Sequence, residues 1–177
     1  AEEQEILSRY VGWGGLADAF DESKPAWETE YLELKIVLTP EEYAAARAST
    51  LNAHYTQPIV IESMYQALEN MGFEKGNILE PAMGVGNFFG MIPEKMENSK
   101  LYGVELDSIS GRIASLLYPD ANIQIKGFEK TDYPNDFFDV VIGNVPFGAY
   151  KVNDRQYEKY NFFIHDYFLA KSLDQLR

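Results

Sequence analysis

A short loop near residue 145, Asn144-Val145-Pro146-Phe147, has the residue types and spacing that could do chemistry. An apolar run from Phe137 to Ile142 leads into it and stops at Gly143, which is typical of a buried strand that feeds a tight loop. The loop presents a side-chain amide, a proline and an aromatic ring in succession. In open α/β sheets, loops at the carboxyl ends of strands bind ligands, so this loop is a candidate site.

A pair of glycines, Gly84 and Gly86, follows a short strand predicted at residues 77–80. Glycines let the backbone approach a ligand closely and present free amides to it, as in loops that hold nucleotide-type cofactors. A turn that needs a positive φ would explain the two glycines equally well. Asn87 follows the pair, so the third glycine of the dinucleotide fingerprint is absent, which argues against a cofactor with a pyrophosphate.

An acidic residue, Glu105, ends the next predicted strand, about 20 residues beyond the glycines, where an acid can accept hydrogen bonds from ribose hydroxyls. A solvated strand end would carry the same residue. Taken together, the glycine pair and the spaced acid favour a cofactor that contains ribose.

Alternating strands and helices must position these residues. Strands are predicted at 77–80, 101–106, 123–125 and 137–142, with helices at 58–71, 109–117 and 162–176. This alternation predicts an α/β fold with a mostly parallel, doubly wound open sheet and helices on both faces.

The first fifty residues form a separate helical pattern. Helices are predicted at 1–10, 27–37 and 40–51, and the last has a cap residue at Thr39, proline at its first position and Glu42 three residues after the cap. We expect residues 1–52 to be a helical lead-in or cap and residues 53–177 to be the core. Trp13, among three glycines, fits a ring that fills a core or a platform for a ligand.

Composition limits the class of protein. With 177 residues, 46% hydrophobic and 24% charged, the chain fits one globular domain. It has no cysteine and two distant histidines, so no metal site is expected. It has no apolar run that could span a bilayer and no signal peptide, so a cytoplasmic protein is expected. The net charge of −13 argues against this chain alone holding duplex DNA.

Five segments, in this order, resemble those of S-adenosylmethionine-dependent, adenine-specific (N6) DNA methyltransferases. Residues 55–58, Tyr-Thr-Gln-Pro, resemble the segment that meets the methionine part of the cofactor, and residues 80–88 resemble the loop Asp-Pro-Ala-Cys-Gly-Thr-Gly-Gly-Phe. Residues 103–107 resemble the ribose-binding strand end, and residues 127–129 lie where the family has an acid and an aromatic near the adenine. Residues 144–147 lie where the family has (Asp/Asn/Ser)-Pro-Pro-(Phe/Tyr/Trp). The opening region further resembles the methylase part of large methylase-helicase proteins of phages and conjugative elements.

This resemblance implies a Rossmann-like methyltransferase fold with strand order third, second, first, fourth, and S-adenosylmethionine as cofactor. The family continues with further strands and a target-recognition domain, so we expect a truncated core from a longer polypeptide that meets DNA through regions outside this chain. The fourth strand is then expected to have an open edge. The resemblance implies that the cofactor is bound by Tyr55, Thr56, Glu80, Pro81, Ala82, Gly84, Gly86, Glu105, Leu106, Phe128 and Glu129, and that the catalytic residues are Asn144, Val145, Pro146 and Phe147.

The chemistry of adenine methylation suits this loop. The lone pair of the exocyclic amine is delocalised into the ring, and two fixed acceptors, the Asn144 side-chain oxygen and a neighbouring main-chain carbonyl, would localise it. The base must leave the duplex to reach the site, and Phe147 offers a ring on which it can stack. Val145 replaces the first proline of the family motif, but valine supplies the same carbonyl, so we expect activity to be retained, in weaker form.

Three alternatives remain. The chain could be a cofactor-binding or structural module of a larger mobile-element protein without catalysis. It could also methylate RNA or a protein glutamine, because related Asn-Pro-Pro-aromatic loops serve those substrates. Basic and aromatic residues are interleaved between Tyr150 and Tyr160. This pattern fits a solvated loop, and it also fits a contact with a nucleic acid backbone or a displaced nucleobase.

Overall fold

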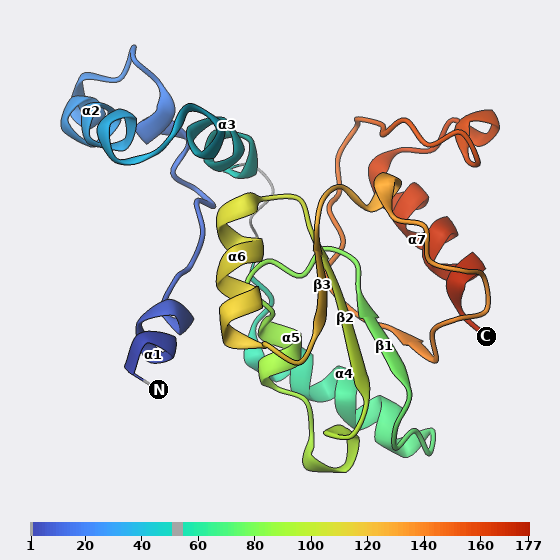
Figure 1. The fold of residues 1–177 in the computed structure, drawn as a ribbon. Coiled ribbons are helices and arrows are strands. Elements are labelled where there is room, and N and C mark those ends of the chain that lie inside the picture. The colour runs from blue at the N-terminus through green and yellow to red at the C-terminus, as the bar shows by residue number, and fades with distance from the viewer. Residues whose placement is uncertain (1, 51–54) are drawn as a thin grey trace.

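A four-stranded parallel sheet forms the centre of the molecule (Figure 1). The computed structural model describes residues 2–50 and 55–177. The strands are β1 (Asn77–Glu80), β2 (Lys100–Glu105), β3 (Asn122–Ile125) and β4 (Val140–Val141), in the order β3-β2-β1-β4, and all three pairings are parallel. The predicted α/β class and strand order are therefore confirmed.

Helices cover both faces of this sheet, as a parallel sheet requires. Along β1, Ile78 packs with α4 (Pro58–Asn70), whereas Leu79 packs with α7 (Ile164–Gln175). Successive strand residues point to opposite faces, so this alternation places the two helices on opposite sides. The remaining helices of this part are α5 (Asn87–Gly90) and α6 (Ser108–Leu117); α6 and α7 flank the strands in Figure 1.

The fourth strand is shorter than the predicted segment 137–142. The amides of Phe137 and Phe138 both donate to the carbonyl of Gln175, each at 2.9 Å, and hydrogen bonding to β1 begins only at Asp139, whose amide donates to the Asn77 carbonyl at 2.9 Å. Phe138 also forms an isolated parallel bridge with Leu176, so the end of the chain covers part of the edge that was expected to be open.

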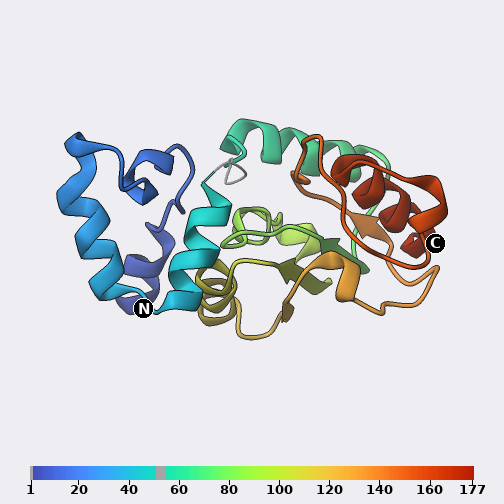
Figure 2. The ribbon, with the colours of Figure 1, turned by 90° about the horizontal axis from the view of Figure 1, so that it is seen from above.

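The N-terminal helices form a layer beside α6 (Figure 2). They are α1 (Glu2–Ser8), α2 (Glu28–Val37) and α3 (Pro40–Ser49), with 3-10 turns at Ala17–Phe20 and Pro25–Trp27. The predicted capping box between Thr39 and Glu42 is present at the start of α3.

This layer has its own small core. Trp13 packs edge-on against Phe20, with ring centroids 5.6 Å apart, so its ring fills that core. The Glu42 carboxylate also forms an ion pair with Arg112 of α6 at 2.6 Å, which joins the layer to that helix. The predicted division at residues 52 and 53 lies outside the described residues and stays a prediction.

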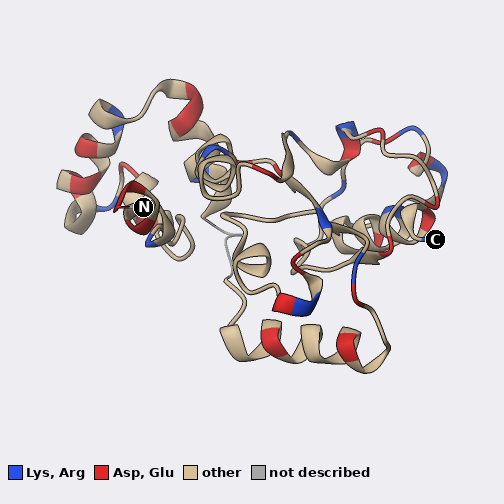
Figure 3. Ribbon diagram, turned by 60° about the horizontal axis from the view of Figure 1, so that its bottom comes forward, with Lys and Arg blue, Asp and Glu red and all other residues tan. Residues whose placement is uncertain are grey.

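Charged residues are distributed unevenly along the chain. Acidic residues dominate the N-terminal helices, whereas acidic and basic residues alternate in the C-terminal part (Figure 3). In residues 2–50 and 55–177, no helix combines the length and apolar character needed to cross a membrane.

Candidate functional site

A cavity of about 430 Å³ lies at the carboxyl ends of β1, β2 and β4. Loops at this edge of an open α/β sheet are where such folds bind ligands. Most of the site residues predicted from the sequence line it, from both the glycine loop and the loop after β4. These residues are Tyr55, Thr56, Glu80, Pro81, Ala82, Gly84, Glu105, Leu106, Phe128, Glu129, Asn144 and Pro146.

Three predicted site residues do not line the cavity. Gly86 is the residue before α5, and its Cα faces the ring of Tyr118. Val145 packs against the core beside α7, and Phe147 has 57% of its surface exposed. The loop after β4 therefore contributes to the cavity through alternate residues, Asn144 and Pro146.

The glycine loop connects β1 to α5 through two left-handed residues. Gly84 has φ of 56° and Gly86 has φ of 85°, values that disfavour any residue with a Cβ. The turn with positive φ, which the sequence analysis gave as an alternative reason for the two glycines, is therefore present. Space for a ligand is present as well, because a Cβ at Gly84 would meet nothing within 4 Å.

The carboxylate of Glu105 holds this loop in place. One oxygen accepts a hydrogen bond from the Gly84 amide and the other from the Asp107 amide, both at 2.7 Å. Burial raises the pKa of Glu105, although these amide hydrogen bonds oppose the shift. Glu105 thus joins the ends of β1 and β2, a structural role that the sequence pattern did not reveal.

Glu80 is the most deeply buried acid of the cavity. It is 2% exposed, and within the described part of the chain its Oε2 has no hydrogen-bond partner. Burial, and then the charge of Glu105, raise its pKa well above the usual value. Buried polar atoms are normally paired, so a donor from a ligand is expected at this oxygen. The other charged side chains of the cavity are Glu105, Asp107, Lys126 and Glu129, which gives a surplus of acids that suits a cationic ligand.

Sequence reasoning missed one whole wall of the cavity. Ala45, Ala48 and Ser49 of α3 line it, together with Gly12. The three α3 residues are spaced so that they lie on one face of the helix. Their spacing predicts this shared face, but it does not predict that the face borders the cavity. Gly12, with φ of 67°, lies against Tyr55, since a Cβ there would be 2.7 Å from the Tyr55 hydroxyl. The N-terminal layer is therefore part of the site.

A second group of lining residues comes from α7 and the loop before it. Ile164 and Phe168 of α7 line the cavity, as do Tyr150 and Val152 from the loop that precedes this helix. They are apolar or aromatic residues in regions predicted as helix and loop. Nothing in the spacing of Ile164, Phe168 and Val152 indicated that they would face a ligand. Tyr150 belongs to the stretch of basic and aromatic residues for which the sequence left a nucleic-acid contact open.

Two proteins of known description resemble the sequence. The chain is 29% identical to the Defense against restriction protein B of Escherichia phage P1 over 181 aligned positions, which include 99% of this chain and 6% of that protein. It is 36% identical over 83 positions to the type II methyltransferase M.CvrRI of Paramecium bursaria Chlorella virus XZ-6E, which include 45% of this chain and 21% of that protein. The chain thus spans a small part of both relatives, and no protein-family model matches it.

Solved structures share the architecture. One is a protein from Listeria monocytogenes assigned to the class I S-adenosylmethionine-dependent methyltransferases, with a TM-score of 0.59 and 16% identity over 88% of this chain and 57% of that one. Another is the methyltransferase subunit of a type I restriction-modification system from Streptococcus thermophilus, with a TM-score of 0.57 and 15% identity over 86% and 40%. The chain therefore has the fold of the S-adenosylmethionine-dependent methyltransferases, as its sequence motifs predicted, and it resembles phage and restriction-modification proteins.

Proposed function

We propose that this chain binds S-adenosylmethionine in the cavity and carries the site at which the methyl group passes to the exocyclic amine of adenine in DNA. The observation that carries the proposal is Glu80, a buried acid with an unpaired oxygen in an acid-rich cavity of a methyltransferase fold. S-adenosylmethionine has a sulfonium and an ammonium group, so its positive charge complements this lining.

The residues of the cavity match the parts of that cofactor. Glu105 uses each oxygen for one backbone amide and retains lone pairs that can accept from ribose hydroxyls. Leu106, Phe128 and Glu129 would border the adenine ring, while Tyr55 and Thr56 would border the methionine part. When bound, the cofactor supplies an electrophilic methyl group.

The acceptor side would hold the target amine. Asn144 and Pro146 border the same cavity as Glu80 and Glu105, so an amine held by the loop would lie beside the methyl donor. The Asn144 side-chain oxygen and the Val145 carbonyl would accept the two amine hydrogens. The lone pair of the amine would then point toward the methyl group of the cofactor. Proximity in such an arrangement contributes about 7–11 kcal/mol in favourable systems.

DNA is the acceptor that the relatives favour. One relative, which aligns with nearly the whole of this chain, is a phage protein for defence against restriction. Another relative is a type II methyltransferase. The net charge of −13 means that DNA affinity must come mainly from regions outside this chain.

Calorimetric titration with S-adenosylmethionine tests the proposal. The wild-type chain should bind, and Glu105→Ala should lose at least about 100-fold in affinity, because both the ribose contacts and the anchor of the glycine loop disappear. Glu74→Ala, which removes an exposed acid far from the cavity, is the matched control and should bind as wild type does. No detectable binding by the wild-type chain would refute the proposal.

Methyl transfer by the full-length protein tests the acceptor. Transfer of labelled methyl groups to DNA is expected, and DNA, RNA and protein acceptors should be compared in the same assay. Transfer to RNA or protein alone would refute the DNA acceptor. Cofactor binding without transfer to any of them would instead support a non-catalytic cofactor module.

A further inference from the structure

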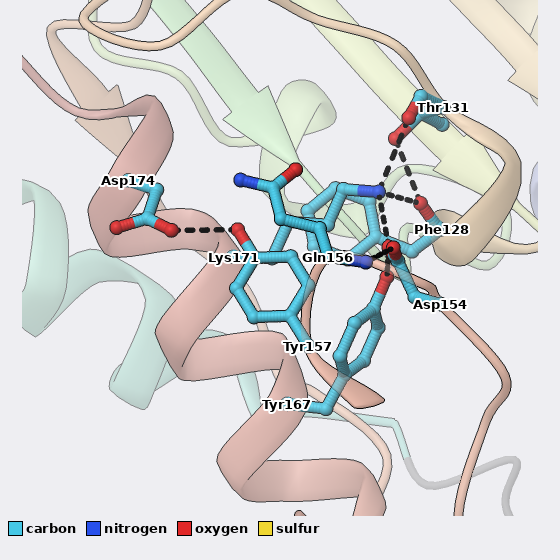
Figure 4. A network of polar contacts seen from close by, with 8 residues as sticks. All are labelled: Phe128, Thr131, Asp154, Gln156, Tyr157, Tyr167, Lys171 and Asp174. Carbon is cyan, nitrogen blue, oxygen red and sulfur yellow. Dashed lines mark hydrogen bonds and ion pairs between the residues drawn. The ribbon is translucent and has the colours of Figure 1, made fainter. Parts of the chain in front are cut away.

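A buried lysine joins the two sides of the cavity. Lys171 of α7 is 5% exposed, and its ammonium group donates to the Phe128 carbonyl at 2.8 Å, the Thr131 carbonyl at 3.1 Å and the Asp154 carboxylate at 3.1 Å (Figure 4). An ammonium group has three protons, so each has an acceptor. Lys171 itself does not line the cavity.

Asp154 is fixed from several directions. The oxygen that meets Lys171 also accepts from the Tyr167 hydroxyl at 2.8 Å, and the other oxygen accepts from the Gln156 amide at 3.1 Å. Partial burial raises the pKa of Asp154, but these hydrogen bonds and the lysine charge together outweigh it, so the net shift of the pKa is downward. The carboxylate is therefore held in its charged form opposite the ammonium group.

The three partners of Lys171 belong to two segments that each contribute residues to the cavity wall. Phe128 and Glu129 lie in the turn after β3, which is the proposed adenine side. Tyr150 and Val152 lie in the segment that follows the Asn144 loop and leads to Asp154. The lysine thus connects the donor-side turn, residues 127–131, with the acceptor-side segment, residues 150–157.

We propose that Lys171 is a positioning residue that holds the donor-side turn and the acceptor-side segment in one arrangement, so that cofactor affinity depends on a residue outside the cavity. The inference rests on the proposed binding of S-adenosylmethionine. Two carbonyls of the donor-side turn accept from the same ammonium group, which restrains the turn that presents Phe128 and Glu129.

A purely structural role for the pair has different consequences. Removing one partner of a buried ion pair destabilises a fold because the other charge is left uncompensated, whereas replacing both by apolar residues is often neutral or stabilising. Stability and cofactor affinity can therefore be separated. Replacing both Lys171 and Asp154 by apolar residues fills the same space and leaves no unpaired charge. It cannot restore the hydrogen bonds to the Phe128 and Thr131 carbonyls.

The test is calorimetric titration with S-adenosylmethionine, paired with thermal unfolding, on the wild-type chain, Lys171→Met and Lys171→Met with Asp154→Leu. Both variants should bind about tenfold more weakly or worse, the effect of losing hydrogen bonds from a charged donor. The double variant should unfold at a higher temperature than Lys171→Met, with no recovery of affinity. If Lys171→Met does not fold, the double variant carries the affinity test alone.

Tyr157→Phe is the matched control. It removes the hydrogen bond to Asp174, at 2.7 Å, which belongs to the same neighbourhood but does not reach the donor-side turn (Figure 4). Its affinity should stay within about twofold of wild type. Wild-type affinity in Lys171→Met, or an affinity that recovers with stability in the double variant, would overturn this inference alone. Absence of binding by the wild-type chain would overturn the proposed function and this inference together.

Discussion

The two sides of the cavity are built differently. On the proposed donor side, the Glu105 carboxylate accepts from the Gly84 amide and Phe128 is 2% exposed, although Leu106 at the rim is 72% exposed. On the acceptor side, the loop follows a strand of two residues, and Phe147 and Tyr150 are 57% and 42% exposed. A small cofactor benefits from a preformed, enclosed site, whereas a macromolecular substrate has to enter from solvent. The difference therefore agrees with a bound donor and an incoming acceptor.

The largest expected effect separates the two sides. Asn144→Ala should reduce methyl transfer by the full-length protein by about 10²–10³-fold, because a preorganised hydrogen-bond acceptor for the reacting amine is lost. Affinity for S-adenosylmethionine should remain within about threefold of wild type, since the donor side keeps its own contacts. Asn153→Ala, an exposed amide of the next segment, is the control for both measurements. Transfer that survives Asn144→Ala would contradict the assigned role.

A smaller effect tests how rigid the donor side is. Gly86→Ala should lower the free energy of unfolding by roughly 2 kcal/mol or more, because φ is 85° and the new Cβ would lie 2.6 Å from Tyr118. Gly72→Ala is matched in backbone conformation, with φ of 84°, but a Cβ there meets nothing within 4 Å. Urea unfolding should show a smaller loss for this control. Equal losses would mean that close packing beneath the glycine loop contributes little.

The smallest expected effect concerns the pH dependence that Glu80 causes. Its folded pKa lies well above the reference value of 4.5, so between those two pH values the unfolded chain loses this proton first. The free energy of unfolding of the wild type therefore falls across that window as pH rises. Glu80→Gln removes this contribution, so its stability should increase relative to wild type as pH rises through the window.

Thermal unfolding of both proteins between pH 4 and 8 measures this difference. Saturating S-adenosylmethionine should shrink it, because a cation beside Glu80 favours the charged form and lowers its pKa. Parallel curves for Glu80→Gln and wild type would show that this carboxyl group does not set the pH dependence.

Local sequence patterns predicted most of the sheet and several residues that line the cavity. The apolar segment at residues 77–80, the glycines that follow it and Glu105 at the end of β2 all lie where the pattern placed them, because strand period, turn chemistry and strand ends are local properties. The capping box likewise predicted the start of α3. The fourth strand was predicted too long, because the Gln175 carbonyl takes two of its amides from far along the chain.

The sequence by itself determined the fold class, the strand order through its family resemblance, and the residues at the strand ends that face the cavity. Tertiary structure alone decided that α3 forms a wall, that Glu105 anchors the glycine loop, and that Lys171 links residues 127–131 to Asp154. These features join residues far apart in the chain, and their contacts depend on how whole elements pack. The sequence shows that Ala45 and Ala48 share a helix face and that Lys171 lies in a helix. It does not show what they contact, because their partners are set by the packing of whole elements.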